Sequence, residues 1–212
     1  EMLQCDPQKR PTAQDLAEVP YVRQCLLLSN AALTDRKKSK QTPAANRPLP
    51  QDKGIQPVVE YLVDNLGNEN NVREALDYLQ TLTQEEGITV DNSAKQVVAK
   101  ATKDYVSEDT IVLLGMQIMN NLIITANADD VMYTPDIISI VPLAMKSHPS
   151  FPSLQRSAAN LLTALSAQDG AAELIGSVGG IQDLLSAIRA FPNMADVCAA
   201  CLHALWNLTV NE

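Results

Sequence analysis

The chain has 212 residues, of which 46% are hydrophobic but only 4% are aromatic, and its formal net charge is −9. A composition rich in aliphatic and poor in aromatic residues favours stacked helices over a β-sandwich. No apolar run reaches the roughly 18 residues that a membrane-spanning helix needs, and no secretory leader opens the sequence. We therefore expect a cytoplasmic protein without a membrane partner.

The charge is divided unevenly along the chain. Residues 1–53 hold nine Lys and Arg against six Asp and Glu, whereas residues 54–212 hold seven against nineteen. A segment this acidic repels nucleic acid and anionic lipid. The charge therefore predicts a protein or peptide partner, more often basic than acidic, and no nucleic acid.

Residues 1–33 open with a proline-punctuated motif. Asp6-Pro7 ends one helix in a turn, Pro11 fixes the backbone, and Thr12 can cap the helix that follows. The segment 3–12 resembles the last conserved segment of the C-lobe of protein kinases, which implies structural roles for Asp6, Arg10 and Pro11. We read residues 1–33 as the tail of a kinase-like domain; the alternative is an ordinary helical pair broken by proline.

The resemblance also implies what this chain lacks. A Gly-rich loop, a strand Lys, a His-Arg-Asp loop and an Asp-Phe-Gly word do not occur in it. In a kinase all of these precede the segment that resembles residues 3–12. We therefore expect no cofactor in this segment, and ATP and Mg only in a preceding lobe if that lobe is active.

Residues 34–53 are polar, basic and contain three prolines, which indicates a disordered linker. A localisation signal or an arm tuned by phosphorylation at Ser39 or Thr42 is the alternative. From residue 54 the apolar spacing predicts paired helices. We expect them at 55–66 and 71–83, 93–106 and 108–125, 136–146 and 153–167, a short one at 171–178, and a last pair around 181–188 and 197–208. Ser153 and Asp196 are the expected N-caps, and Lys95 stands where the other units have Ile.

A repeat underlies these pairs. Gly54-Ile55-Gln56 recurs as Gly180-Ile181-Gln182, and equivalent second-helix positions follow each other after 40, 43 and 43 residues at Thr81, Asn121, Ala164 and Asn207. A period near 42 made of two or three helices is typical of helical solenoids.

Two five-residue words carry a family resemblance. Residues 204–208, Ala-Leu-Trp-Asn-Leu, and residues 118–122, Ile-Met-Asn-Asn-Leu, resemble the word that closes the third helix of armadillo repeats. The resemblance covers residues 54–212. It implies an all-α fold, a right-handed armadillo- or HEAT-type solenoid (α-α superhelix) of about 3.5 to 4 units, with a further unit expected to cover the apolar last helix.

Few residues suggest catalysis. His148 lies in a predicted turn and His203 on the last helix, and no nucleophile stands beside either. Cys198 and Cys201 share a helical face, but structural zinc wants two such pairs, so buried packing cysteines are the preferred reading. Asp129-Asp130 and Glu85-Glu86 are read as helix-start charges and solvated faces, and Met116, Met119, Met132 and Met145 as core.

The resemblance implies one binding surface. In peptide-binding armadillo proteins an Asn on each third helix, with a Trp one turn earlier, lines the concave groove. Here two of the four Asn positions are Asn, and none of the positions one turn earlier is Trp. A polar stripe remains as the candidate partner-binding site: Asp77, Thr81, Gln117, Asn121, Asn160, His203 and Asn207. The alternative is that these are solvated positions opposite the apolar stripe.

These observations favour a non-catalytic interaction scaffold in a serine/threonine kinase-like, or pseudokinase, protein. Its partner would be a peptide, another protein or its own kinase-like lobe. The alternative is a regulatory, substrate-docking solenoid of an active ATP-dependent kinase.

Overall fold

The computed structural model describes residues 48–51, 53–85 and 88–210. The chain divides into the units Glu1–Arg47 and Pro48–Glu212, and the described residues belong to the second. The kinase-tail residues Asp6, Arg10 and Pro11 and the linker up to residue 47 lie outside the described ranges. Within those ranges the structure is helical and has no β-strand, which confirms the prediction of an all-α fold.

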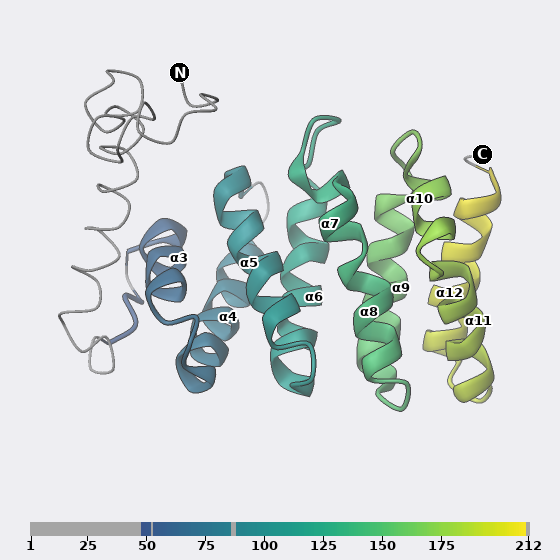
Figure 1. Ribbon diagram of the computed structural model, residues 1–212, viewed down its shortest axis with the longest axis horizontal. Helices are drawn as coiled ribbons and strands as arrows, with labels where there is room; N and C mark the ends of the chain where they lie inside the picture. Colours follow the sequence, from purple (N-terminus) through teal and green to yellow (C-terminus); the bar gives the residue numbers. More distant parts are fainter. Residues whose placement is uncertain (1–47, 52, 86–87, 211–212) are drawn as a thin grey trace, which may run out of the picture. The chain divides into compact units, whose positions relative to one another are not determined.

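The helices follow the predicted order closely (Figure 1). They are α3 (Ile55–Asp64), α4 (Glu69–Thr83), α5 (Asn92–Asp104), α6 (Asp109–Ile123), the 3-10 turn η3 (Val131–Tyr133), α7 (Pro135–Ile138), α8 (Ile140–Ser147), α9 (Pro152–Leu165), α10 (Ala171–Ser177), α11 (Gly180–Ala190) and α12 (Ala195–Val210).

The longer helices form two layers. In one layer α4, α6, α9 and α12 pack side by side in chain order, and in the other α3, α5, α8 and α11 do the same. Each helix of the first layer also packs on the helix that precedes it in the second, as α5 on α6 and α11 on α12. Apolar side chains recur along each helix at three- and four-residue spacing, so a helix buries its stripe only against these neighbours.

Side-chain caps set two of the helix starts. Asn68 accepts a hydrogen bond from the Asn71 backbone N–H at 3.3 Å. Asp91 does the same for Ala94 at 2.7 Å. The expected caps at Ser153 and Asp196 are wrong, because α9 begins at Pro152 and α12 at Ala195, which places both residues inside the first turn. Proline fixes a helical φ at the start of α9 without a side-chain cap.

The helix expected over 136–146 is broken. Helix α7 ends at Ile138 and α8 begins at Ile140, with Ser139 between them. Pro142 lies four residues after Ile138. Its ring has no N–H to donate to that carbonyl and crowds it, so a continuous helix is disfavoured there.

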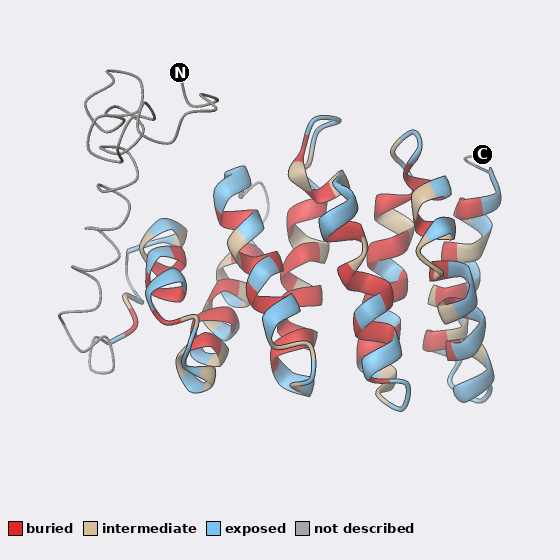
Figure 2. Ribbon diagram, viewed as in Figure 1, coloured by how far each residue is buried: buried red, intermediate tan, exposed pale blue. Residues whose placement is uncertain are grey.

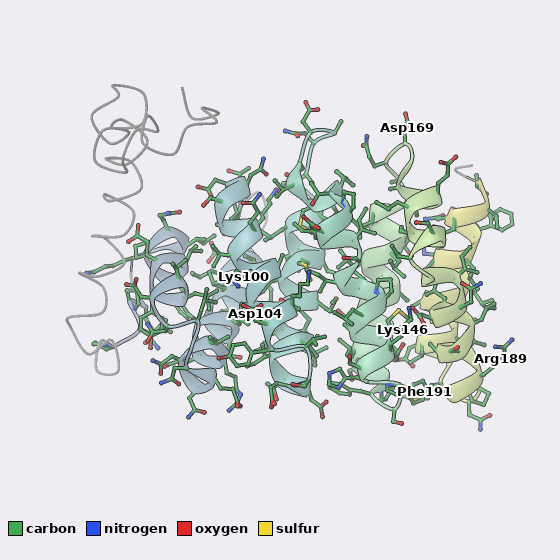
Figure 3. The ribbon with its side chains drawn as sticks, in the orientation of Figure 1. Lys100, Asp104, Lys146, Asp169, Arg189 and Phe191 are labelled. Atoms are coloured by element: carbon green, nitrogen blue, oxygen red, sulfur yellow. The ribbon has the colours of Figure 1, made fainter. Side chains whose placement is uncertain are left out.

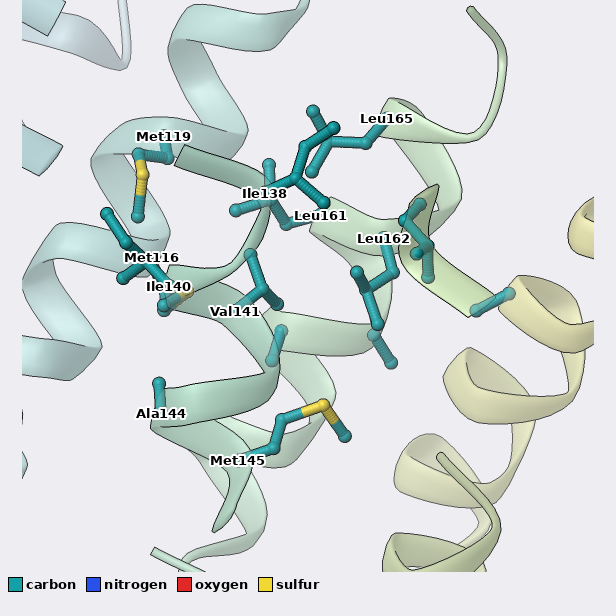
Figure 4. Packing of buried hydrophobic residues seen from close by; sticks show 14 of the residues in the cluster. Met116, Met119, Ile138, Ile140, Val141, Ala144, Met145, Leu161, Leu162 and Leu165 are labelled. Atoms are coloured by element: carbon teal, nitrogen blue, oxygen red, sulfur yellow. The ribbon is translucent and has the colours of Figure 1, made fainter. Parts of the chain in front are cut away.

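Buried residues recur along the helices (Figure 2). Among the residues that the structure describes they form two hydrophobic clusters, and helix α6 contributes to both. Ile111, Ile118 and Leu122 pack with α3, α4 and α5, whereas Met116 and Met119 pack with the later helices. Figure 4 shows this second cluster, where Met116 and Met119 lie beside α8. The four methionines predicted as core are all buried: Met116, Met119, Met132 and Met145. Leu49, which falls in the predicted linker, is buried in the first cluster.

Lys95 keeps its place in the helix through a buried ion pair. Its ammonium group contacts the carboxylate of Asp130, and the two side chains are 3% and 7% exposed. Asp130 also accepts a hydrogen bond from the Met132 N–H at 3.0 Å, which starts η3. The prediction that Asp130 lies at the start of a helical turn is therefore confirmed, but the prediction that its side chain is solvated is wrong. Lys95 can occupy a buried position where the other units have Ile because Asp130 provides the opposite charge.

Candidate binding groove

The first helical layer carries a groove of about 530 Å³. Helices α4, α6 and α9 each supply part of its lining, which is mostly polar. The lining residues are Gln80, Gln84, Leu113, Gln117, Asn120, Asn121, Ser153, Arg156, Ser157 and Asn160.

Three of the seven predicted stripe residues meet in this groove. Gln117 and Asn121 lie one turn apart on α6, and Asn160 faces them from α9. Gln117 and Asn121 are half-buried and Asn160 is exposed. The other four, Asp77, Thr81, His203 and Asn207, lie on α4 and α12 of the same layer but do not line the groove.

Asn120 holds two walls of the groove together. Its amide nitrogen donates to the Met116 carbonyl at 2.8 Å and to the Ser157 carbonyl on α9 at 2.9 Å. The stripe prediction missed Asn120, although it lies in the word that suggested the repeat. The available signal was its place beside Asn121, because neighbouring residues on a helix point about 100° apart and the two side chains therefore face different neighbouring helices.

Asn121 is likewise engaged with a neighbouring helix. Its amide nitrogen donates to the hydroxyl of Thr83 at 3.1 Å, which ties α6 to the end of α4. Thr83 is buried at 7% exposure. Replacing Asn121 would therefore disturb the groove wall as well as the groove surface.

Carboxamides dominate the chemistry of the lining. Six of the ten lining side chains are Asn or Gln, and none is Asp or Glu. Each carboxamide offers both a donor and an acceptor, the two functions that an extended peptide backbone also presents. The one charged lining residue, Arg156, is paired with Asp196 of α12 at 3.1 Å, and both side chains are half exposed.

The chain matches no protein-family model, no curated protein and no solved structure.

A second hollow of about 390 Å³ adjoins the groove. It shares Gln84 and Asn121 with the groove and adds Ile88 and Ile124, and Ile124 is 81% exposed. Glu85 also lines it. The polar groove therefore continues into a partly aliphatic hollow beside the ends of α4 and α6.

The opposite layer has a hollow of its own, about 480 Å³, between α5 and α7. Lys100 and Asp104, labelled in Figure 3, contribute to it and form an exposed pair at 2.6 Å across one turn of α5. Lys103 and Asp136 also line it. An exposed pair of this kind adds little to binding or stability.

The two histidines have different surroundings. His148 is buried, and its ring contacts the Val106 carbonyl at 2.5 Å and the Asp109 carboxylate at 2.6 Å. These contacts join the loop before α9 to the start of α6. His203 is exposed on α12. His148 therefore acts as a link between helix pairs, a role that its predicted turn position did not reveal.

Cys201 is buried and Cys198 half-buried. Burial, with a smaller contribution from Cys198, raises the pKa of the Cys201 thiol to about 11. The Cys198 thiol donates to the Phe191 carbonyl at 3.2 Å. Among the residues that the structure describes, no cluster of three His, Cys, Asp or Glu is placed to hold a metal ion. A thiol kept protonated is a poor nucleophile and a poor metal ligand.

None of the helices in the described ranges combines the length and the apolar character that crossing a bilayer requires.

Proposed function

We propose that residues 54–212 form an armadillo- or HEAT-type solenoid that binds an extended stretch of another polypeptide in the groove across α4, α6 and α9. The observation that carries the proposal is the convergence of carboxamides from three successive helices on one groove. Armadillo-like stacking is supported by the two layers and by links between helix pairs about one period apart. Asn120 to Ser157 and His148 to Val106 span 37 and 42 residues.

The ligand would be held mainly through its backbone. Carboxamides on neighbouring helices can donate to peptide carbonyls and accept from peptide N–H groups without regard to the ligand's side chains. Because the lining itself has no carboxylate, any preference for a basic partner would come from the acidic surface around it. Because residues 1–33 resemble the tail of a kinase-like domain, the module would serve as a non-catalytic scaffold within a kinase or pseudokinase protein.

The test is a selection of peptides on the intact chain. Random twelve-residue peptides displayed on phage are selected, and the affinities of the selected peptides are measured by fluorescence polarisation. We expect Gln117→Ala with Asn160→Ala to weaken them at least tenfold. The melting temperature of this double variant should barely change, because replacing polar surface residues with Ala alters the free energy of unfolding by about half a kcal/mol.

The matched control is Asp77→Ala with His203→Ala. Both residues belong to the predicted stripe, lie on the same helical layer and do not line the groove. Equal loss of affinity in both double variants, or no enriched peptide at all, would contradict the proposal. Affinity for a basic selected peptide should also fall as salt shortens the Debye length below the roughly 8 Å of physiological buffer.

A further inference from the structure

The hollow of about 390 Å³ beside the groove, which we call the side hollow, has two aliphatic walls. Ile88 and Ile124 both line it, and Ile124 is 81% exposed. The hydroxyl of Thr125 donates to the Ile88 carbonyl at 3.4 Å, which ties the segment at Ile88 to the end of α6. An inserted side chain with a long carbon chain would bury apolar surface against both isoleucines.

The ends of two helices make the side hollow electrically negative. Helices α4 and α6 both end there, since their C-cap residues Gln84 and Ile124 line it. The last carbonyls of a helix carry a partial negative charge. Neither helix has a basic residue in its last turn, whereas the last turns of α5, α8 and α11 hold Lys103, Lys146 and Arg189. The chain itself therefore provides no cation for the ends of α4 and α6.

Glu85 adds a full negative charge to the same space. Its side chain is exposed and lines the side hollow. Among the lining residues that the structure describes, no other is ionisable. The carboxylate and the two helix ends act with the same sign, so they favour a positively charged group. Together with the aliphatic walls they fit a cation at the end of a carbon chain, which is the chemistry of lysine and arginine side chains.

The position of the side hollow indicates where such a side chain would come from. Gln84 and Asn121 line both the side hollow and the groove across α4, α6 and α9. Successive side chains of an extended polypeptide point to opposite sides of its backbone. A polypeptide that lies in the groove and passes Asn121 can therefore direct one side chain into the side hollow.

We propose that the side hollow is a specificity subsite that takes a lysine or arginine side chain of the bound polypeptide. The carbon chain packs on Ile88 and Ile124, and the cation lies at Glu85 and the ends of α4 and α6. This inference rests on the proposed groove function for the source of the side chain. Its chemistry rests on the side hollow alone, so the two can be tested separately.

A single-residue probe tests the subsite without the groove. The full 212-residue chain, labelled at its isoleucine methyl groups, is titrated with Nα-acetyl-lysine N-methylamide and followed by NMR. The matched probe is the norleucine analogue, which has the same carbon chain without the ammonium group. We expect the lysine probe to shift the Ile88 and Ile124 methyl signals with millimolar affinity. The norleucine probe should bind about fivefold more weakly.

Three variants separate the charge from the aliphatic walls. Glu85→Gln should reduce the preference for lysine over norleucine about twofold. Asp77→Asn is the matched control, because it removes one carboxylate from an exposed residue of α4 that lines neither the side hollow nor the groove. It should leave the preference unchanged. Ile124→Ala, followed through the Ile88 methyl signal, should weaken both probes by the same factor. Circular dichroism of each variant checks that it is folded.

The selected peptides give the second readout. They should carry Lys or Arg at one fixed position, and norleucine at that position should weaken binding about fivefold. The loss should be smaller in Glu85→Gln than in the wild type. Peptides that depend on Gln117 and Asn160 but have no fixed basic position would leave the groove function standing and overturn the subsite. A lysine probe that binds at Ile124 when no peptide is enriched would support the subsite and contradict the groove.

Other results with the probes also overturn the proposal. Neither probe moving the Ile88 and Ile124 signals would show that the side hollow takes no side chain. Equal affinity for the two probes would make it an aliphatic site without preference for a cation. A preference that Asp77→Asn lowers as much as Glu85→Gln does would come from the net charge of the chain and not from the side hollow.

Discussion

Lys95 and Asp130 form an ion pair from which water is almost excluded, and they come from elements 35 residues apart in the chain. Lys95 lies on α5, whereas Asp130 begins the turn η3 ahead of α7 and α8. The pair therefore links two successive helix pairs at a position where the next unit has the buried Ile138.

Removing one partner of this pair should be costly. Lys95→Met leaves the Asp130 carboxylate buried without a counter-charge, and we expect a loss of about 3–5 kcal/mol in the free energy of unfolding. Adding Asp130→Asn should restore more than half of it. The amide is uncharged and can still accept from the Met132 N–H. Urea unfolding of both single variants and the double variant measures this, and strictly additive losses would show that the charges do not interact.

Gly115 allows α5 and α6 to approach each other closely. A Cβ atom at this position would lie 2.0 Å from Oγ1 and 2.8 Å from Cβ of Thr102, which is itself buried. Gly115→Ala should therefore force the two helices apart and destabilise the protein by about 1–3 kcal/mol, as overpacking does. The gain in helix propensity from Gly to Ala, about 1 kcal/mol, offsets only part of this.

Thr102→Ala provides the control for Gly115→Ala. This substitution removes Oγ1 of residue 102, the atom closest to a Cβ at position 115, but leaves the Cβ of residue 102, which lies 2.8 Å from it. The Gly115→Ala, Thr102→Ala double variant should therefore recover part of the lost stability and not all of it. Urea midpoints of the two single variants and the double variant decide the question. A Gly115→Ala protein as stable as the wild type would mean that the helices can separate without cost.

Sequence alone located the helices well but not the links between them. Apolar spacing placed α9 and α12 to within a few residues, because a stripe at helical period has one consistent reading. The partners of Lys95, Asn120 and His148 lie 35 to 42 residues away. No local pattern indicates a pairing over that distance.

The stripe shows the same division. Offsets along the repeat placed all seven residues on one layer, but only three line the groove, because the depth of a surface depends on how neighbouring helices pack. Leu205 on α12 is only partly buried. It corresponds to Leu162 one unit earlier, which is buried, and the apolar spacing around the two residues does not indicate this difference in burial.

Asp183 should make stability depend on pH in an unusual direction. Burial raises the pKa of its carboxyl above 3.8 in the folded protein, and the nearby Lys146 only partly opposes this. The folded state therefore binds a proton more readily than the unfolded state does. This carboxylate costs stability at neutral pH, and the cost disappears as pH falls through the raised value towards 3.8.

Asp183→Asn removes that titration. We expect the variant to have a higher urea midpoint than the wild type at pH 7, and the difference should shrink as pH is lowered to about 4. Comparing the two proteins at each pH cancels the titration of every other carboxylate. A variant less stable at pH 7, with the gap closing at low pH, would mean that the contact with Lys146 outweighs desolvation. Figure 3 shows Lys146 on α8, on the side facing α11.

Helix α6 belongs to two cores at once, since its opposite sides complete separate hydrophobic clusters. Neither half of this domain should fold on its own, because the hydrophobic cluster of each half includes side chains from the same fifteen-residue helix. Opening should therefore spread inward from the two ends, and α6 should be the last segment to exchange its amide protons. A proline in the middle of α6 would then destabilise both hydrophobic clusters. The same change in α11 would destabilise only the C-terminal end of the domain.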